Sequence, residues 1–316
     1  MRALFITDSQ IRGRNPINRS GIFVDDIYDK FKEVVKIGKE MEVDCFIHGG
    51  DFFDRPIVSL GVADRFVDLM EKTEKPWWIV RGNHDEIGHN PQLSGESMLD
   101  HLFRRSNLVK HLGGIAMDDG KVFLEGFDYY HDIEKDLKEK GLKSSMPHLE
   151  GKQIAVVHAL ITPNPLHPQI MHALCDEIQT DFDLVLCGHF HYEFGIYKVP
   201  EQGVTYVGIG ALARMSIAKW DAVRRPNVLY IDTDVPTMKI IPLESAKEAS
   251  ELFNLEKLSE EVEVNARIDQ FVASLESTKF QGLNLRGIIE NIAKQGSVDR
   301  KVVDEVIKRI GEFEEE

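Results

Sequence analysis

The sequence predicts an α/β protein in which two packed, mixed β-sheets are flanked by helices and followed by a small C-terminal helical appendage. Three observations predict this class: apolar runs rich in β-branched residues recur along the chain, helical periodicity separates the first of them, and strand signals stop near the C-terminus. The chain has 316 residues, of which 42% are hydrophobic, so it can bury a full-sized core and carry a small addition.

The front of the chain alternates strands and helices in the manner of a parallel sheet. We expect buried strands at residues 3–7, 45–48 and 77–80, and helices at 23–42 and 62–72 between them. Because parallel strands need long crossover connections, this rhythm favours a parallel sheet covered by helices. Further apolar runs predict later strands, at residues 122–125, 154–157 and 184–187.

The later part of the chain is richer in strand signals. Segments 195–199, 204–210, 227–234 and 238–243 alternate with turns that contain Gly, Pro or Asp, which predicts antiparallel strands that close the second sheet.

The C-terminal part has a different pattern. Apolar residues recur at helical spacing in 254–273 and 298–310. We therefore expect a catalytic domain at 1–243 and a helical appendage at 244–316, which either caps the domain, binds a partner or packs on its own core.

The surface charge is acidic. Acidic residues number 53 against 38 basic ones, for a formal net charge of −15, so the surface as a whole repels phosphate polymers. Autonomous high-affinity DNA binding is not expected, although a local basic rim is compatible with this total.

The compartment follows from the cysteines and from the lack of targeting signals. Cys45, Cys175 and Cys187 lie in apolar stretches without CxxC spacing, which predicts small buried thiols in a reducing compartment. No apolar run approaches the roughly 20 residues that span a bilayer, and the N-terminus does not resemble a signal peptide. We expect a cytoplasmic protein without a membrane partner.

Five short polar motifs occur in order, four of them directly after a predicted strand. Carboxyl ends of parallel strands open on one edge of a sheet, so these motifs can converge. A single motif is more simply explained as a turn, but five in this order favour one joint site. They are TDSQ (7–10), GGDFFD (49–54), RGNHD (81–85), VVHAL (156–160) and GHFH (188–191).

The side chains of these motifs suit a pair of divalent ions, because they combine carboxylates, imidazoles and neutral oxygen donors. The candidate ligands are Asp8, Gln10, Asp51, Asn83, His158, His189 and His191. Asp51 is the candidate bridge. One ion would add Asp8, Gln10 and His191. The other would add Asn83, His158 and His189, and a bridging water or hydroxide between the ions would attack phosphorus.

Two further residues are candidates for catalysis without metal coordination. His84 follows the ligand Asn83 directly, so its imidazole is expected over the site, where it could protonate the leaving oxygen. Asp85 is next in sequence and could orient that ring.

The motif set resembles that of the calcineurin-like metallophosphoesterases, namely DxH, GDxxD, GNHD, an isolated His and GHxH. Here these are DSQ, GDFFD, GNHD, His158 and GHFH, over roughly residues 1–243. The resemblance implies the four-layer sandwich of that superfamily. GGDFFDRP, RGNHD and the stretch from GHFH through GIGALARM to NVLYIDTD are most similar to the nuclease subunit, SbcD, of the bacterial SbcCD complex and its double-strand-break-repair relatives.

This closer resemblance implies a Mn²⁺-dependent DNA exonuclease and endonuclease, with Mg²⁺ as the alternative ion, working with an SMC-like ABC ATPase in DNA break processing. The sequence leaves open whether two copies pair as a homodimer. The chain departs from the family pattern at Gln10, where a His is expected. An amide oxygen can hold a hard ion such as Mn²⁺, but it is a weaker ligand than imidazole for zinc or iron. We expect Gln10 to coordinate and the first metal site to be looser.

A basic loop follows the first ligand pair and is a candidate for holding a DNA backbone. Its candidate substrate-binding residues are Arg12, Arg14, Asn15 and Arg19, with Asn18 beside them. The alternative is a solvated loop closed by arginine–carboxylate pairs. Arg55, Arg214, Arg224 and Arg225 are weaker candidates for the same rim.

Two other functions stay open at this point. A phosphatase or phosphodiesterase for a small molecule or phosphoprotein would use the same metal pair in a closed pocket. A non-catalytic scaffold would keep the fold while Gln10 disables one metal site.

Overall fold

The computed structural model describes residues 1–16, 19–87, 95–145, 151–167, 169–215, 221 and 224–253. The chain divides into two compact units, Met1–Asn254 and Leu255–Glu316, and every described residue belongs to the first. The helices expected at 254–273 and 298–310 lie outside the described residues, as does Asn18. The expected boundary after residue 243 stays a prediction.

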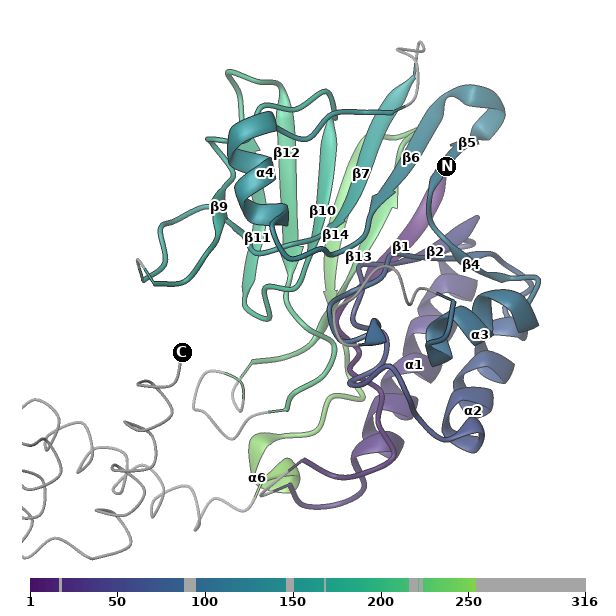
Figure 1. The fold of residues 1–316 in the computed structure, drawn as a ribbon. Coiled ribbons are helices and arrows are strands. Elements are labelled where there is room, and N and C mark those ends of the chain that lie inside the picture. The colour runs from purple at the N-terminus through teal and green to yellow at the C-terminus, as the bar shows by residue number, and fades with distance from the viewer. Residues whose placement is uncertain are drawn as a thin grey trace, which may run out of the picture. The chain divides into compact units, whose positions relative to one another are not determined.

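The first sheet has six strands within the described residues, in the order β14-β13-β1-β2-β3-β4 (Figure 1). Its centre is parallel, as the strand–helix rhythm predicts. The parallel strands are β1 (Arg2–Ile6), β2 (Cys45–His48), β3 (Trp77–Ile79) and β4 (Val109–His111). An antiparallel pair, β13 (Asn227–Asp232) and β14 (Thr237–Pro242), extends the sheet beyond β1.

The second sheet, again within the described part of the chain, has the order β11-β12-β10-β7-β6-β5. Its central strands are parallel and both edge strands are antiparallel. From one edge to the other they are β11 (Glu193–Val199), β12 (Val204–Ile209), β10 (Leu184–Gly188), β7 (Lys152–His158), β6 (Val122–Phe127) and β5 (Gly114–Met117). Two short strands, β8 (Ile161–Thr162) and β9 (Ala173–Leu174), pair separately.

The expectation that all four late strands close the second sheet is wrong for two of them. β11 and β12 join it, but β13 and β14 add to the first sheet, with Leu4 opposite Tyr230. The alternation along β13 fits either sheet, because one face of it meets the helices and the other meets the opposite sheet. Local pattern therefore indicates a strand without naming its partner.

Helices cover the outer face of each sheet, which gives four layers (Figure 1). α1 (Phe23–Glu40), α2 (Leu60–Glu71) and α3 (Met98–Arg105) lie on the first sheet, and α4 (Ile133–Lys140) lies on the second. The short α6 (Ala249–Leu252) ends the described chain, and a 3₁₀ turn, η3 (Asp118–Gly120), follows β5. α3 and α4 are absent from the sequence-based prediction, although Ser97 caps α3 by accepting from the Asp100 N–H.

The core is layered because strand side chains alternate between two buried faces. In β1, Ala3 and Phe5 enter the cluster between the sheets, whereas Leu4 and Ile6 enter the cluster beneath α1 and α2. Each such fully buried aliphatic or aromatic side chain contributes about 1.5–3 kcal/mol of transfer free energy. Two-sided burial explains why the strands appear in the sequence as continuous apolar runs.

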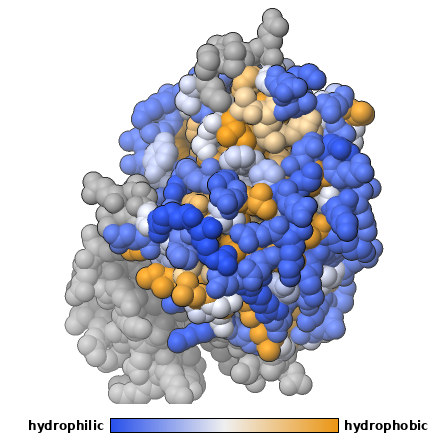
Figure 2. Space-filling view, turned by 90° about the vertical axis from the view of Figure 1, so that its right-hand side faces the viewer, coloured by the Kyte–Doolittle hydropathy of each residue, from blue (hydrophilic) through white to orange (hydrophobic). Residues whose placement is uncertain are grey.

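The surface features agree with part of the composition argument. The three cysteines are buried and free, which confirms the expectation of small core thiols. On the α2 and α3 side of the molecule, the face is hydrophilic over most of its area with small separate hydrophobic patches (Figure 2). No helix among the described residues is long and apolar enough to cross a membrane.

Candidate metal centre

The polar motifs meet where the carboxyl ends of both sheets come together. Asp8 and Asp51 follow β1 and β2, and His158 is the last residue of β7. His189 follows β10, and its backbone N–H donates to Asp8 Oδ2 at 3.1 Å, across 181 residues of sequence. The loops of one sheet are therefore joined to those of the other.

The backbone at this edge is held in an unfavourable conformation. Asp8, Gln10, Asp51 and His189 have φ values of 51°, 48°, 51° and 73°, and they make up half of the non-glycine residues with positive φ in the described chain. Left-handed backbone is disfavoured for L-residues and costs on the order of 1–3 kcal/mol, and such strain tends to gather at functional sites. Hydrogen bonds from Asp8 N to Gly50 O and from Gln10 N to Asp51 O hold the turns.

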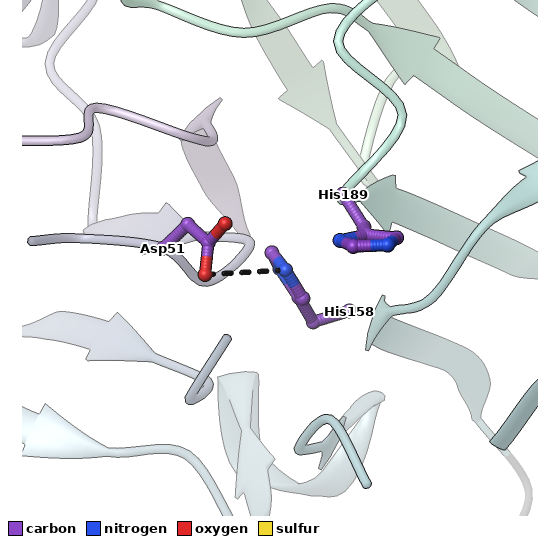
Figure 3. A group of neighbouring side chains, drawn as sticks. All are labelled: Asp51, His158 and His189. Carbon is purple, nitrogen blue, oxygen red and sulfur yellow. Dashed lines mark ion pairs between the residues drawn. The ribbon is translucent and has the colours of Figure 1, made fainter. Parts of the chain in front are cut away.

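Two groups of potential metal ligands lie at this edge, and both contain Asp51. The first is Asp51, His158 and His189, and the second is Asp8, Asp51 and His191. Within each group the ligand atoms lie within 4.8 Å of one another. In Figure 3 the imidazole of His158 lies between the Asp51 carboxylate and the ring of His189. A carboxylate shared by two such groups is the arrangement that bridges a pair of ions.

The Asp51 carboxylate is buried and presents one oxygen to each side. Its Oδ1 accepts from the His84 backbone N–H at 2.9 Å and lies 3.4 Å from His158 Nε2. Its Oδ2 accepts from Gln10 Nε2 at 2.8 Å. Burial raises the pKa of Asp51, but the charge and hydrogen bond of His158 outweigh it and hold the pKa below its usual range.

Asp8 contributes an oxygen that lacks a hydrogen bond. Its Oδ2 accepts from Thr7 Oγ1 at 2.6 Å, whereas Oδ1 is buried, has no hydrogen-bond partner among the described residues and lies 3.5 Å from His191 Nε2. A buried carboxylate oxygen without a partner is unfavourable unless a cation or proton compensates it. This oxygen, beside a second imidazole and a second carboxylate, fits a divalent ion.

The histidines differ in charge because their neighbours differ. His158 Nδ1 contacts Gly49 O at 2.7 Å, which leaves Nε2 facing Asp51 and, at 3.2 Å, Asn83 Oδ1. Burial disfavours its protonated form, yet the Asp51 charge raises the pKa of His158 to about 10. Burial and the positive charge of His158 lower the pKa of His189 to about 4. His158 must therefore lose its proton to serve as a ligand, whereas His189 is already neutral.

Two glycines allow the close packing of this centre. A Cβ on Gly82 would collide with the Asp51 side chain and backbone. Gly50 has a φ of 95°, and a Cβ there would collide with the His158 ring.

Comparison with known proteins agrees with this geometry. The family model of the Calcineurin-like phosphoesterases matches residues 1–193. The chain belongs to this family. A solved structure of a dimetal phosphatase from Danio rerio has a TM-score of 0.51 at 12% identity, and the match covers 78% of this chain and 97% of that one. That likeness confirms the fold of this phosphoesterase.

Curated relatives of the phosphoesterase are DNA double-strand break repair proteins named Mre11. The protein from Methanosarcina mazei is 25% identical over 58% of this chain, that from Sulfurisphaera tokodaii 22% over 75%, and that from Methanosarcina acetivorans 22% over 90%. The chain spans 29%, 62% and 47% of their respective lengths, less than two-thirds in each case.

Gln10, which stands where the family pattern has a histidine, is buried beside the shared carboxylate of Asp51. Its Nε2 donates to Asp51 Oδ2, so its amide nitrogen faces the centre in this structure. Coordination through Oε1 would require the amide to turn over. Metal coordination by Gln10 therefore stays a prediction.

The general-acid candidate His84 is partly exposed, at 43% of its side chain, with Nε2 3.9 Å from Asp51 Oδ2. Its Nδ1 contacts Asp54 O at 2.9 Å, and this carbonyl, not Asp85, fixes the ring. Asp85 is instead buried and accepts backbone N–H groups from Gly82, Phe52 and Phe53. The expectation that Asp85 orients His84 is corrected accordingly. Burial and the Asp51 charge raise the pKa of Asp85 to about 7.

Sequence reasoning missed two residues that position the centre. His48, the last residue of β2, has Nε2 3.0 Å from Ser9 Oγ and accepts at Nδ1 from Gly50 N–H, and burial lowers its pKa to about 3. Arg81 holds the RGNHD loop in place by two ion pairs, from Nη2 to Asp100 Oδ1 at 2.6 Å and from Nη1 to Asp128 Oδ2 at 2.9 Å. The sequence feature that could have identified them is position: His48 directly precedes the GGD run, and Arg81 directly precedes GNHD.

The basic loop divides into exposed and buried members. Arg12 pairs with Asp54 at 3.0 Å, and Arg14 is exposed with no ion pair among the described residues. Asn15 accepts from Phe23 N–H at the start of α1 and donates to Gly21 O, so both ends of its amide are engaged. Its side chain therefore accepts from the first N–H of α1, whose N-cap residue is Ile22.

Arg19 does not lie on the rim. Its guanidinium is fully buried, pairs with Asp26 at 2.6 Å and donates to Arg214 O. Asp26 also pairs with buried Lys30 at 2.9 Å. Arg19 is thus a core cation under the 211–215 segment and does not face a substrate, which corrects the sequence-based expectation. Arg214 is buried nearby, and Arg224 pairs with Asp221.

A pocket of about 360 Å³ opens beside the centre on the His84 side. It is lined by Arg12, Asp54, Arg55, Pro56, Asn83, His84 and Glu86.

Proposed function

We propose that this phosphoesterase is a Mn²⁺-dependent DNA nuclease, comparable to the SbcD subunit of a break-processing machine. The observation that carries the proposal is the placement of an arginine-lined pocket directly beside His84 and the shared carboxylate Asp51. Similarity to archaeal Mre11 proteins supports it. Carboxylate, amide and imidazole ligands suit Mn²⁺, with Mg²⁺ as the alternative.

The chemistry would be hydrolysis of a phosphodiester. Two divalent ions, when bound, would activate a water molecule and neutralise charge on the phosphoryl oxygens. Asp51 would hold the ions together, and Asp8 and His191 on one side and His158, His189 and Asn83 on the other would complete their surroundings.

His84 would act on the leaving group. The His84 side chain is 43% exposed, and its Nε2 would give a proton to the leaving oxygen while Nδ1 is held by Asp54 O. The water oxygen would form the new bond to phosphorus and lose a proton to solvent, the ester P–O bond would break, and the His84 proton would end on the departing oxygen to give a hydroxyl.

A partner is part of the same proposal. By resemblance, an SMC-like ABC ATPase would bind the chain, through the appendage at 244–316 or another surface. Such a partner would offset the net charge of −15, which disfavours DNA binding by this chain alone.

The test compares hydrolysis of bis(p-nitrophenyl) phosphate with that of p-nitrophenyl phosphate, and of single- and double-stranded DNA with Mn²⁺, Mg²⁺ or chelator. The DNA assays are run with and without an SMC-like ABC ATPase. The nuclease proposal requires a clear preference for the diester. A strong preference for the monoester would contradict it and favour a phosphatase.

A further inference from the structure

The pocket beside His84 carries charges that the hydrolytic step does not use. Arg12 and Arg55 both face the carboxylate of Asp54, at 3.0 and 3.8 Å from the same oxygen. Arg12 is only 22% exposed and makes the shorter contact, so it is the better satisfied of the two. Arg55 is 75% exposed at its side chain, and its guanidinium keeps donors for a ligand.

A second and independent feature of the pocket is Glu86. It is 8% exposed, and its Oε2 is buried without a hydrogen-bond partner among the described residues. Buried carboxylate oxygens are rarely left without a donor, since such an oxygen loses its hydration without gaining a hydrogen bond. Burial and the nearby Asp128 raise the pKa of Glu86 above its usual value. The pocket is therefore lined by two arginines and by a carboxylate with one oxygen that lacks a hydrogen-bond partner among the described residues.

We propose that this pocket binds the leaving nucleotide of the substrate, with Arg55 holding the next phosphate along the strand and Glu86 accepting a hydrogen bond from the nucleotide. The proposal rests on the proposed function, because His84 lines the pocket and would protonate the leaving oxygen. A volume of about 360 Å³ is near the lower end of ordinary ligand pockets and suits one nucleotide unit.

The pocket would set the substrate class. A guanidinium binds a phosphate through charge-assisted, often paired, hydrogen bonds. A polynucleotide supplies a phosphate one unit beyond the scissile bond, whereas a simple phosphate ester does not. The centre would then favour polymeric substrates through Arg55, although the chain as a whole is acidic.

The experiment uses the full chain, Mn²⁺ and an oligonucleotide in which the linkage next to the scissile bond, on the leaving side, is a neutral methylphosphonate. For the unaltered protein, neutralising that one linkage should lower kcat/KM by about tenfold, the worth of one charge-assisted hydrogen bond. Arg55→Ala should lower kcat/KM on ordinary DNA by a similar factor and should no longer distinguish the two oligonucleotides. Glu86→Ala should also lower kcat/KM on DNA relative to bis(p-nitrophenyl) phosphate.

The matched control is Arg2→Ala, which removes the same charge from a partly exposed arginine at the start of β1, outside the pocket. This variant should still discriminate between the two oligonucleotides as the unaltered protein does. If Arg55→Ala keeps the full discrimination, or if hydrolysis of the chromogenic diester falls as much as that of DNA, the pocket does not bind the leaving nucleotide. If the unaltered protein cleaves no DNA but hydrolyses the monoester, the proposed function itself fails.

Discussion

Replacing Asp26 by Ala tests whether a buried charge cluster supports the metal centre. Asp26 Oδ2 lies 2.6 Å from Arg19 Nη2 and 2.9 Å from Lys30 Nζ, with side-chain exposures of 2%, 0% and 0%. The two cations in turn donate to Arg214 O and Leu212 O. That segment donates from Leu212 N–H to Thr7 O and from Ala213 N–H to Asp8 O, so the cluster supports the backbone beside Asp8.

The expected magnitude follows from the two cations left unpaired. Removing one partner of a buried ion pair costs about 3–5 kcal/mol, since the remaining charge keeps its desolvation penalty. Because Asp26 pairs with two cations, Asp26→Ala should lower the free energy of unfolding by about 5 kcal/mol. The neighbouring Asp25 pairs with Arg65 at a half-exposed site, where a salt bridge is worth about 0–1 kcal/mol.

The assay is urea denaturation of Asp26→Ala, Asp25→Ala and the unaltered chain under identical metal concentrations. Asp26→Ala should lower the free energy of unfolding by several kcal/mol more than Asp25→Ala. If the two variants lose the same amount, or Asp26→Ala loses less than about 1 kcal/mol, the buried cluster does not have the assigned role.

The pH dependence of stability gives a second measurement of this cluster. Burial outweighs the Asp26 charge and lowers the pKa of Lys30 from 10.5 to about 8. Below pH 8 both folded and unfolded chains hold the proton and the cost of burying the charge is fully present. Between pH 8 and 10.5 only the unfolded chain holds it, so this group makes stability rise with pH, by about 3 kcal/mol in all. Lys30→Met should abolish the rise, and an unchanged profile in that variant would contradict the assignment.

Other predictions concern the centre itself. His84→Ala should abolish DNA cleavage while metal content, measured by mass spectrometry, stays the same; residual activity equal to that of the unaltered chain would refute its role as proton donor. Gln10→His should tighten binding of the weaker Mn²⁺ ion by about tenfold or more in calorimetry, because imidazole replaces a weaker ligand; an unchanged isotherm, or one ion per chain even at saturation, would show that Gln10 holds no metal. Because the pKa of His158 is about 10, a metal ion must displace its proton, so metal affinity should rise with pH over the neutral range. Calorimetric titration with Mn²⁺ in several buffers of different ionisation enthalpy should show that about one proton per chain is released on binding.

Much of the centre follows from local sequence. Asp8, Asp51 and His189 each come shortly after the end of a buried strand, and the carboxyl ends of parallel strands share an edge, so their convergence was predictable. Roles that depend on contacts between separate loops were not predictable. Asp85 is adjacent to His84 in sequence, yet its carboxylate turns inward to three backbone N–H groups.

The sequence by itself determined most of the strands, the order of the motifs and the candidate ligands of a two-ion centre, because these depend on residue type, periodicity and position relative to strand ends. Only the tertiary structure decided that β13 and β14 extend the first sheet, that Arg19 is a core cation and that Glu86 lines a pocket with an unpartnered oxygen. Which strands pair, and whether a charged side chain can be buried, depends on strands and oppositely charged groups that lie far away in the sequence. Local pattern carries no information about those partners.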